Sequence, residues 1–330
     1  MTVLVTGGAG YIGSHMVWQL VDAGEAVVVL DNLATGFRWA IAPEAIFVNG
    51  DVGDEALIAR LIGEHGIDAI IHFAGSIVVP ESVADPLAYY LNNTVRSRSL
   101  IAAAVKGGVR AFIFSSTAAV YGTPGLAPVA ETAALKPESP YGRSKMMTEM
   151  MLADAGAAHG LRYAALRYFN VAGADPKGRT GQSTKGATHL IKIACEAALG
   201  KRAEVTVYGT DYPTPDGTGV RDYIHVSDLV GAHAEALGYL RGGGASLVAN
   251  CGYGRGYSVL EVIETVKRVS GRPLNVHFGP RRAGDAASVV ASPALIMSKL
   301  GWKPALDDLG GIVESALAWE AALGRRNQRD

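Results

Sequence analysis

Cysteine is scarce in this chain: Cys195 and Cys251 are the only two among 330 residues. They lie far apart and show neither a CxxC spacing nor the spacing of thiolate metal ligands. A disulfide framework is therefore excluded, and a reducing compartment such as the cytoplasm is expected. The histidines also lack metal-ligand spacing, so we predict no metal.

The chain also has little net charge and no long apolar run. A formal net charge of −1 creates no field that would attract nucleic acid or anionic lipid, so neither is expected as a partner. No apolar run reaches the roughly 18–20 residues of a membrane span, and the glycine-rich segment 6–13 is unlike a signal peptide. With 49% hydrophobic and 18% charged residues, a soluble globular protein with a large core is expected.

Short apolar runs alternate with helical patterns through the first half of the chain. The runs are 3–5, 26–30, 46–48, 69–73 and 111–114, and helical stretches near 55–64 and 86–107 separate the later ones. Continuous apolar strands between helices indicate a parallel sheet that is covered on both faces. We therefore predict an α/β fold with a doubly wound parallel Rossmann sheet, whose ligands lie beyond the carboxyl ends of the strands.

The composition changes after residue 170. Residues 171–188 are rich in Gly, Thr, Asp and Lys, and prolines interrupt the shorter elements that follow. We predict that residues 1–170, with a returning helix at roughly 220–247, form the Rossmann domain. Residues 171–219 and 248–330 are predicted to form a second, smaller substrate-binding domain.

A glycine-rich turn lies between the first predicted strand and the first predicted helix. Gly7, Gly10 and Gly13 would let backbone N–H groups and a helix N-terminus approach a pyrophosphate. Asp31 ends the second strand, where a carboxylate can accept hydrogen bonds from an adenosine ribose, although a plain turn residue would look the same. Because that carboxylate would repel a 2′-phosphate, the sequence favours NAD over NADP.

Further polar or small residues follow the other strands. Asp51 could accept a hydrogen bond from the adenine amine or cap a helix. Phe73, Ala74 and Gly75 form a turn where the backbone could approach the cofactor. Asn92 and Asn93 fall in a helical stretch although Asn is a mediocre helix former, and a cofactor-side role would explain one of them.

Tyr141 and Lys145 form a YxxxK motif, which places both side chains on one face of a helix. Reversible hydride transfer from a carbinol to NAD needs a base, and a free phenol with a pKa of about 10 is a poor one. A nearby ammonium and a positive nicotinamide would favour the phenolate. Thr117, at the end of the fifth strand, could hydrogen-bond the substrate oxygen or cap the next turn.

These motifs occur in a recognisable order. They are TGGAGYIG (6–13), LDN (30–32), HFAG (72–75), SSTAAVYG (115–122), SPYGRSK (139–145), LRYFNVAG (166–173), DGTGVRDYIHVSDL (216–229) and RRAGD (281–285). In order and spacing, and over essentially the whole chain, they resemble the UDP-glucose (UDP-galactose) 4-epimerase family of extended short-chain dehydrogenases/reductases. The resemblance implies an NAD-dependent isomerase of galactose and carbohydrate metabolism that inverts C4′ through a 4-keto intermediate.

The resemblance also implies roles for individual residues. Thr117, Tyr141 and Lys145 would be catalytic. NAD contacts would come from Gly7, Gly10, Tyr11, Ile12, Gly13, Asp31, Asn32, Asp51, Val52, Phe73, Ala74, Gly75, Asn92, Lys145, Tyr168 and Phe169. UDP-sugar contacts would come from Thr117, Tyr141, Asn170, His189, Leu190, Thr206, Val207, Tyr208, Arg221, Arg282, Asp285 and Val289. A homodimer joined through the YxxxK helix and the helix near 86–107 is also implied.

Four positions depart from the better-known members of that family. Thr117 replaces a common Ser and keeps the same donor and acceptor. Ile77 replaces a Lys that contacts the cofactor, so that contact is missing or replaced. His189 replaces an Asn and could contact phosphate or only pack. Val289 stands near the sugar where some members have Tyr, which leaves room for an N-acetylhexosamine; UDP-pentoses are a further alternative.

Two other functions remain as alternatives. A sugar-nucleotide 4,6-dehydratase or decarboxylase would need an acid and a base beside Thr117, but Ala118 and Ala119 follow it and cannot move a proton. A non-catalytic NAD-sensing or scaffold protein could share the fold. The intact Thr117, Tyr141 and Lys145 argue against that reading.

Overall fold

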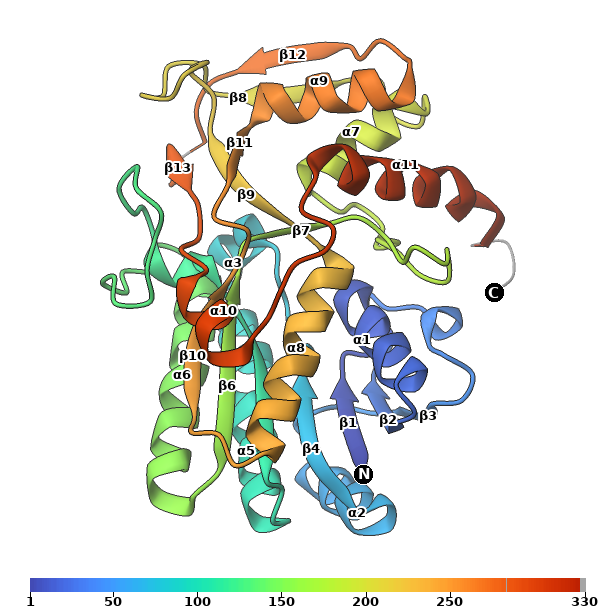
Figure 1. Cartoon of the computed structure of the whole chain (residues 1–330), viewed down its shortest axis with the longest axis vertical. Helices are drawn as coiled ribbons and strands as arrows, with labels where there is room; N and C mark the ends of the chain where they lie inside the picture. The colour runs from blue at the N-terminus through green and yellow to red at the C-terminus, as the bar shows by residue number, and fades with distance from the viewer. Residues whose placement is uncertain (283, 327–330) are drawn as a thin grey trace.

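A seven-stranded parallel sheet forms the centre of the larger part of the molecule (Figure 1). The computed structural model describes residues 1–282 and 284–326. The strands are β1 (Thr2–Thr6), β2 (Ala26–Asp31), β3 (Ile46–Asn49), β4 (Ile67–His72), β5 (Ala111–Thr117), β6 (Arg162–Tyr168) and β10 (Leu247–Cys251), in the order β10-β6-β5-β4-β1-β2-β3. Every neighbouring pair is parallel. The predicted doubly wound sheet is confirmed, and its order reverses between β1 and β4, where such sheets bind ligands.

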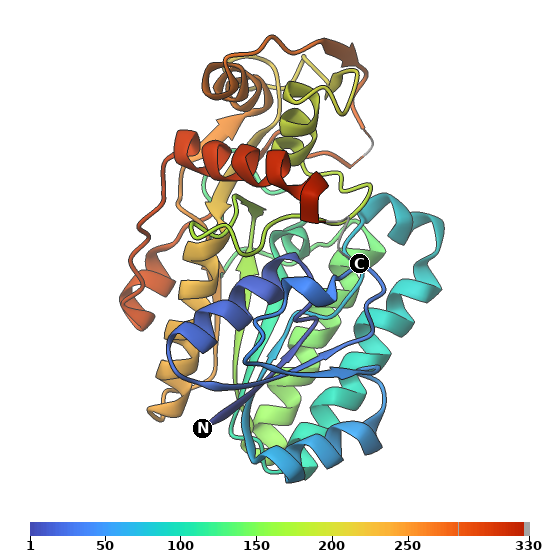
Figure 2. The ribbon, with the colours of Figure 1, turned by 90° about the vertical axis from the view of Figure 1, so that its right-hand side faces the viewer.

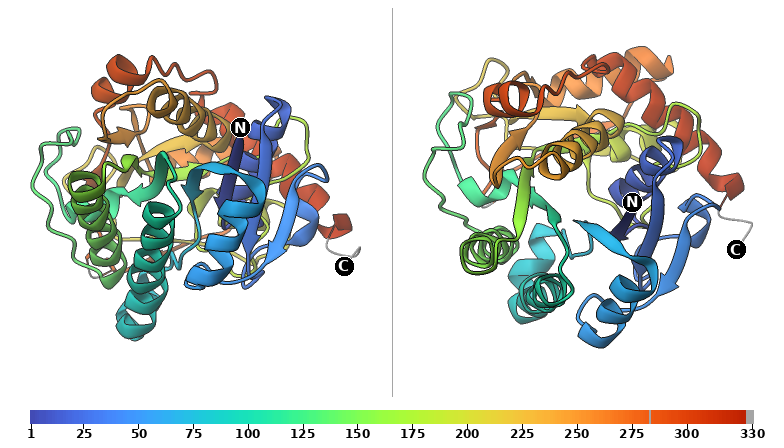
Figure 3. Two further views of the ribbon diagram at one scale, coloured as in Figure 1. Left: turned by 90° about the horizontal axis from the view of Figure 1, so that it is seen from below. Right: turned by 60° about the horizontal axis from the view of Figure 1, so that its bottom comes forward.

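Helices cover both faces of this sheet, as Figure 3 shows in views along the strands. On one face lie α1 (Tyr11–Asp22) and α8 (Val226–Arg241), and on the other α2 (Glu55–His65), α5 (Arg96–Lys106) and α6 (Pro140–His159). Alternation along β1 explains the two cores: Val3 packs in the cluster of Met16, whereas Leu4 packs in the cluster of Ile58. Among the described residues, no helix is long and apolar enough to cross a membrane.

The helical stretch predicted near 86–107 is not one regular helix. It begins as α4 (Pro86–Tyr89), continues as the π-helical turn η2 (Tyr90–Val95) and ends as α5. A short helix, α3 (Val79–Ala84), precedes it, and 3₁₀ turns occur at η1 (Arg38–Ala40) and η3 (Ala118–Tyr121). The π turn carries Asn92 and Asn93, so it changes which of them faces the protein interior.

Smaller sheets lie beyond the carboxyl ends of the central strands. A four-stranded sheet contains β7 (Asn170–Ala172), β9 (Val220–His225), β11 (Gly256–Ser258) and β13 (Ser288–Val289), and β8 (Val205–Tyr208) pairs with β12 (Val276–Gly279). Helices α7 (Leu190–Ala198), α9 (Val259–Ser270) and α11 (Leu309–Arg326) share a third core, and α10 (Ala294–Leu300) packs beside β10. The division into two domains stays a prediction. β9 pairs with the small sheet and β10 with the central one, across the predicted boundaries at 220 and 247.

The segment predicted as a long loop after residue 170 lies between the two parts. Figure 2 shows α11 (red) above α1 (blue), with this segment between them. The hydroxyl groups of Ser14 and Thr180 are 2.7 Å apart and fully buried. Trp319 packs against Gly181, where a Cβ would come within 2.4 Å of the indole ring. These contacts fasten the smaller part to the first helix of the central fold.

Buried histidines make the stability of this fold sensitive to acid. Burial lowers the pKa of His15, His225 and His233 to about 4, and that of His72 to about 3. The unfolded chain would bind protons near pH 6.5, so it gains more protons than the folded protein as the pH falls below that value. Asp222, whose pKa burial raises to about 6, acts in the opposite direction but is a single group.

We therefore expect the free energy of unfolding to decrease between pH 7 and pH 5, by up to about 2 kcal/mol per buried histidine. Urea denaturation at several pH values, at constant ionic strength, measures this. Equal stability at pH 7 and pH 5 would show that these imidazoles are protonated in the folded state.

Candidate active site

The turn between β1 and α1 is built so closely that two of its glycines cannot be replaced. Gly7 has φ +70°, and a Cβ there would lie 2.6 Å from the backbone nitrogen of Ala74. A Cβ on Gly13 would lie 2.1 Å from the carbonyl oxygen of Gly7. Gly10 is less confined, with its nearest contact at 3.2 Å. No side chain therefore covers the backbone of this turn. The turn leads into the N-terminus of α1, where the helix dipole favours binding of an anion.

Asp31 lies at the end of β2 beside the same turn. Its carboxylate is almost fully buried and accepts hydrogen bonds from the backbone N–H of Ala9, at 2.9 Å, and of Leu33, at 2.8 Å. These bonds hold the loop after β2, in which Leu33 has φ +57°, against the glycine turn. Asn32 is exposed and accepts a bond from the N–H of Ala34. Each oxygen of Asp31 keeps a lone pair, so the turn role and the ribose-binding role are compatible.

The ends of β3 and β4 supply a second polar group at this edge. Asp51 accepts a hydrogen bond from the N–H of Gly53 at 2.7 Å and forms an ion pair with Arg96 at 3.1 Å. Asn92 donates to the hydroxyl of Ser76 at 2.8 Å and accepts from Arg96 at 2.7 Å. Sequence reasoning missed Arg96, because one of its partners, Asp51, is distant in the sequence and the other, Asn92, lies in a π-helical turn.

Asn93, rather than Asn92, is the buried asparagine of the π turn. Its amide accepts from the N–H of Ser76 at 2.8 Å and donates to the carbonyl oxygen of that residue at 2.9 Å and to Ser144 at 3.1 Å. A Cβ on Gly75 would lie 3.0 Å from the Asn93 oxygen and 3.6 Å from Nζ of Lys145. Asn93 therefore fixes the turn after β4, which contains the predicted Phe73, Ala74 and Gly75.

Thr117, Tyr141 and Lys145 lie together beyond the ends of β5 and β6. The hydroxyl of Thr117 is close enough to the phenol of Tyr141 to lower its pKa, and it accepts a hydrogen bond from the N–H of Ala119 at 3.2 Å. Nζ of Lys145 is buried and donates to the carbonyl oxygen of Ser115 at 3.0 Å. The substrate and turn-capping readings of Thr117 are therefore both geometrically possible.

Burial shifts the pKa of both ionisable groups in this cluster. Burial raises the pKa of Tyr141 above its usual value, and the hydrogen bond with Thr117 lowers it only in part. Burial also lowers the pKa of Lys145 to about 8. Because its ammonium is directed at Ser115, Lys145 does not by itself offset the desolvation of the phenol. In the protein alone Tyr141 is protonated, and a cationic ligand beside it is needed to favour phenolate.

Tyr168 and Phe169 follow at the end of β6. The hydroxyl of Tyr168 is bonded to Ser115, and its ring lies 5.9 Å from that of His233. Burial raises the pKa of this phenol as well. Phe169 packs in a small cluster with Val289 and the η3 turn. Tyr168 thus supports Ser115 on β5, whose carbonyl oxygen accepts the bond from Lys145, and Phe169 faces the smaller part.

Two arginines face the smaller sheets. Arg221 on β9 lies 3.8 Å from Asp285 and is the register partner of Val289 on β13. The guanidinium of Arg282 lies 3.6 Å from the ring centre of Tyr208 and lowers the pKa of that phenol. The predicted substrate residues therefore form two arginine-centred groups. Thr206 and Val207 belong to the same strand as Tyr208; Val207 is buried and Thr206 partly exposed.

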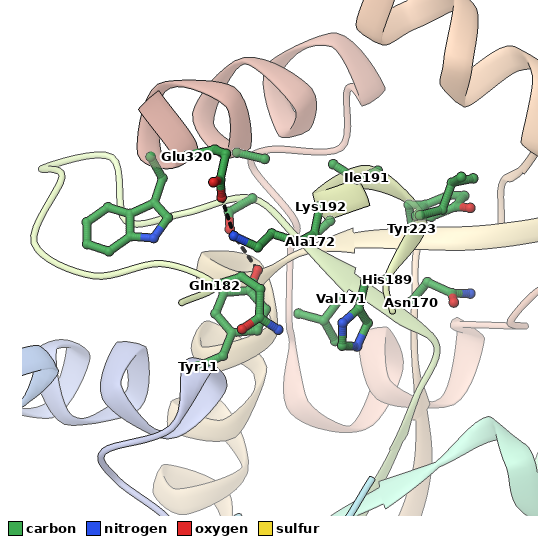
Figure 4. A pocket seen from close by; sticks show the side chains of 14 residues that line it. Tyr11, Asn170, Val171, Ala172, Gln182, His189, Ile191, Lys192, Tyr223 and Glu320 are labelled. Carbon is green, nitrogen blue, oxygen red and sulfur yellow. Dashed lines mark hydrogen bonds and ion pairs between the residues drawn. The ribbon is translucent and has the colours of Figure 1, made fainter. Parts of the chain in front are cut away.

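A small cavity lies between the start of α1 and the start of α7 (Figure 4). Its lining includes Tyr11 from the glycine turn, Asn170 from β7, and His189 and Leu190 at the start of α7. Burial lowers the pKa of His189, and its Nδ1 has no hydrogen-bond partner among the described residues. The structure therefore brings these cofactor and substrate candidates to one space.

The deep wall of this cavity contains a buried ion pair. Lys192 on α7 bonds Glu320 on α11 (Figure 4). Lys201 reaches the same carboxylate at 2.7 Å. Both ammonium groups and both carboxylate oxygens therefore have a partner of opposite charge. The network fixes α7 against α11 and leaves neither lysine free to bind an anion. Sequence reasoning missed both Lys192 and Glu320, since nothing in a single sequence pairs residues 128 positions apart.

Comparison with known proteins gives a consistent result. The NAD dependent epimerase/dehydratase family matches residues 3–252. The UDP-glucose 4-epimerase of Azospirillum brasilense is 57% identical over 321 residues, covering 97% of this chain and 92% of that protein. The solved UDP-glucose 4-epimerase of Brucella ovis in complex with NAD is 45% identical, with a TM-score of 0.93 over 96% of this chain and 97% of that one.

A second solved relative adds a ligand. The UDP-glucose 4-epimerase of Stenotrophomonas maltophila, with bound NAD and formylated UDP-arabinopyranose, is 41% identical to this chain. Its TM-score is 0.95, and the match covers 99% of both chains. The similarity therefore extends over the central sheet and the smaller part alike.

Proposed function

Because this chain belongs to the NAD dependent epimerase/dehydratase family, and within it to the UDP-glucose 4-epimerases, we propose that it interconverts UDP-glucose and UDP-galactose with NAD as its cofactor. The observation that supports this most strongly is 57% identity across 97% of the chain. The cluster of Tyr141 with the buried Thr117 and Lys145 supports it independently. The chain is therefore an isomerase, and no net oxidation is expected.

The residues present fit a dinucleotide. The glycine turn leaves a backbone surface that a Cβ at Gly7 or Gly13 would fill, and it faces the N-terminus of α1. Asp31 would hold the adenosine ribose and Asp51 the adenine, while Lys145 would hold the nicotinamide ribose. When bound, the dinucleotide would supply a reversible hydride acceptor for C4′ of the sugar.

The protein side chains would manage the proton and the orientation of the sugar. Tyr141 would take the proton from the 4′-hydroxyl, and Thr117 would hydrogen-bond that oxygen. The raised pKa of the isolated phenol implies that the base forms only when a cation is bound beside it. Tyr141 would then remove the proton only in the complex of the enzyme with both dinucleotide and UDP-sugar.

The nucleotide part of the substrate needs cations for its diphosphate. Arg221 and Arg282 are placed to supply planar guanidinium groups, each already oriented by a neighbour, Asp285 or Tyr208. If the nucleotide is held tightly and the sugar loosely, the 4-keto sugar can rotate and present its opposite face before the hydride is returned.

The direct experiment supplies purified protein with UDP-galactose and no added reductant. UDP-glucose is expected to accumulate to a constant ratio, with no net change in the redox state of the cofactor. A preparation with NAD bound that formed no UDP-glucose would exclude this function.

Substrate range is the finer part of the proposal. Val289 is a small side chain beside Arg221 and packs with Phe169, so we propose that N-acetylated hexoses are also accepted. Val289→Tyr is expected to lower kcat/KM for UDP-N-acetylgalactosamine at least tenfold, because a larger ring would occupy the space of the N-acetyl group. Activity on UDP-galactose should change less than about threefold.

Parallel assays with UDP-galactose, UDP-N-acetylgalactosamine and UDP-xylose measure this effect. A uniform loss across the three substrates would mean that Val289 does not determine the range. Activity on UDP-xylose alone in the unmodified enzyme would favour the pentose alternative.

We also propose that the enzyme is a homodimer that works in the cytoplasm, in galactose metabolism. Exposed apolar side chains support a dimer: Val83 on α3, Leu87 on α4 and Leu91 on η2 are 64, 77 and 51% exposed. These elements pack against α6, whose Met150 is 58% exposed. Together they form an apolar surface that a second copy would cover.

A further inference from the structure

Arg96 joins two polar residues at the adenine end of the expected dinucleotide site. It is the first residue of α5, directly after the π turn. Its Nη1 donates to Oδ1 of Asn92 at 2.7 Å, and its Nε lies 3.1 Å from Oδ1 of Asp51. A planar guanidinium can make both contacts at once, whereas an ammonium on a flexible stem cannot hold both in a fixed plane.

The position of this group follows from the sheet. Asn49 at the end of β3 is the register partner of Asp31 on β2, so Asp51 lies just beyond the strand that neighbours the ribose candidate. Asn92 in turn bonds Ser76, in the segment after β4. A hydrogen-bonded chain from Asp51 through Arg96 and Asn92 to Ser76 therefore crosses the carboxyl edge from β3 to β4.

One oxygen of Asp51 remains available. Both contacts of this carboxylate, with Arg96 and with the N–H of Gly53, use Oδ1. Within residues 1–282 and 284–326, Oδ2 has no hydrogen-bond partner, and the side chain is about one third exposed, at 36%. The carboxylate is thus fixed on one side and free to accept a donor on the other.

We propose that Arg96 is a positioning residue for adenine recognition: it orients Asp51 so that Oδ2 accepts the exocyclic amine of the adenine ring. This inference rests on the proposed function, because it needs a dinucleotide at the glycine turn. Arg96 does not touch the reacting atoms. Its effect is confined to cofactor affinity and to discrimination between adenine and rings that lack the amine.

The test compares two dinucleotides with full-length protein from which bound nucleotide has been removed. NAD has the adenine amine, whereas nicotinamide hypoxanthine dinucleotide has a carbonyl in its place. The unmodified protein is expected to prefer NAD by about tenfold in Kd, the usual size for a hydrogen bond to a charged acceptor. Arg96→Met should weaken NAD binding by about the same factor and leave the hypoxanthine analogue within twofold, so that the preference disappears.

Arg98→Met is the matched control. Arg98 lies two residues further along α5 and forms an ion pair with Glu55 at 2.7 Å, away from Asp51. It should leave both dissociation constants unchanged, and kcat at saturating NAD should be unaffected in either variant. Arg96→Lys should also lose the preference for NAD, because lysine keeps the positive charge but lacks the planar guanidinium that contacts Asn92 and Asp51 together.

The outcomes separate this inference from the proposed function. If the unmodified protein bound neither dinucleotide, the proposed function would fail. If it bound both, and Arg96→Met weakened both equally or neither, Arg96 would have no role in adenine recognition. Titration calorimetry gives the dissociation constants, and thermal unfolding shows whether each variant is folded.

Discussion

Tyr141→Phe is expected to lower kcat by about a thousandfold or more, while the protein still binds NAD. The substitution removes one oxygen and keeps the ring, so packing at the start of α6 is preserved. Without the phenol no group accepts the 4′-hydroxyl proton, and loss of a general base costs roughly 10²–10⁴ in rate. Steady-state assays with UDP-galactose, together with the nucleotide content of the purified variant, measure both effects.

Tyr163→Phe is a suitable control for removing a tyrosine hydroxyl. Tyr163 lies near the start of β6, at the end of the sheet opposite Thr117. Its variant should keep full activity. A Tyr141→Phe enzyme with an unchanged rate would remove Tyr141 from the mechanism, whatever its position in the structure.

The rate of the unmodified enzyme should depend on the ionisation of the same phenol. Burial raises the pKa of Tyr141, so protonation opposes the reaction at low pH and kcat/KM should rise as the pH increases. The rising limb should be absent from the residual activity of Tyr141→Phe. This comparison links the slow step to the phenol rather than to the stability of the fold.

Gly13→Ala is expected to abolish measurable binding of NAD, a loss of at least a hundredfold in affinity. A methyl group at this position would lie 2.1 Å from the carbonyl oxygen of Gly7. The backbone of the turn would have to move away from the first turn of α1 to relieve this clash. The displaced backbone would no longer present its N–H groups to a pyrophosphate. Titration of the stripped protein with NAD measures the loss.

Gly63→Ala controls for adding a methyl group elsewhere. Gly63 is in α2, and a Cβ there meets nothing within 4 Å. It should leave NAD binding unchanged and raise stability by up to about 1 kcal/mol, because alanine is the better helix former. Tight NAD binding by folded Gly13→Ala would mean that the dinucleotide does not lie on this turn.

Much of the fold followed from local patterns. Apolar runs of three to five residues between helices predicted the parallel sheet, because only a sheet covered on both faces buries such strands completely. The glycine turn, Asp31 and the YxxxK pair were found because each has a fixed spacing within one strand–turn–helix unit or one helix. Parallel strands then bring their ends to one edge.

The rest depended on contacts that no local pattern records. Arg96 at the start of α5 meets Asp51 only in the folded sheet, and Lys192 meets Glu320 only after α7 packs on α11. The pKa of Tyr141 could not be predicted from the sequence either, because it depends on how deeply the phenol is buried. Spacing placed an ammonium near it, but burial raises the pKa of the phenol, and Lys145 donates to Ser115.

The central claim is that C4′ loses and regains the same hydrogen through a bound cofactor. Epimerisation of UDP-galactose in deuterium oxide tests this most directly, with the product analysed by NMR. UDP-glucose with no deuterium at C4′ is expected, because a hydride held within the protein does not exchange with water. Deuterium at C4′ of the product would contradict it and would show that the carbon is deprotonated instead.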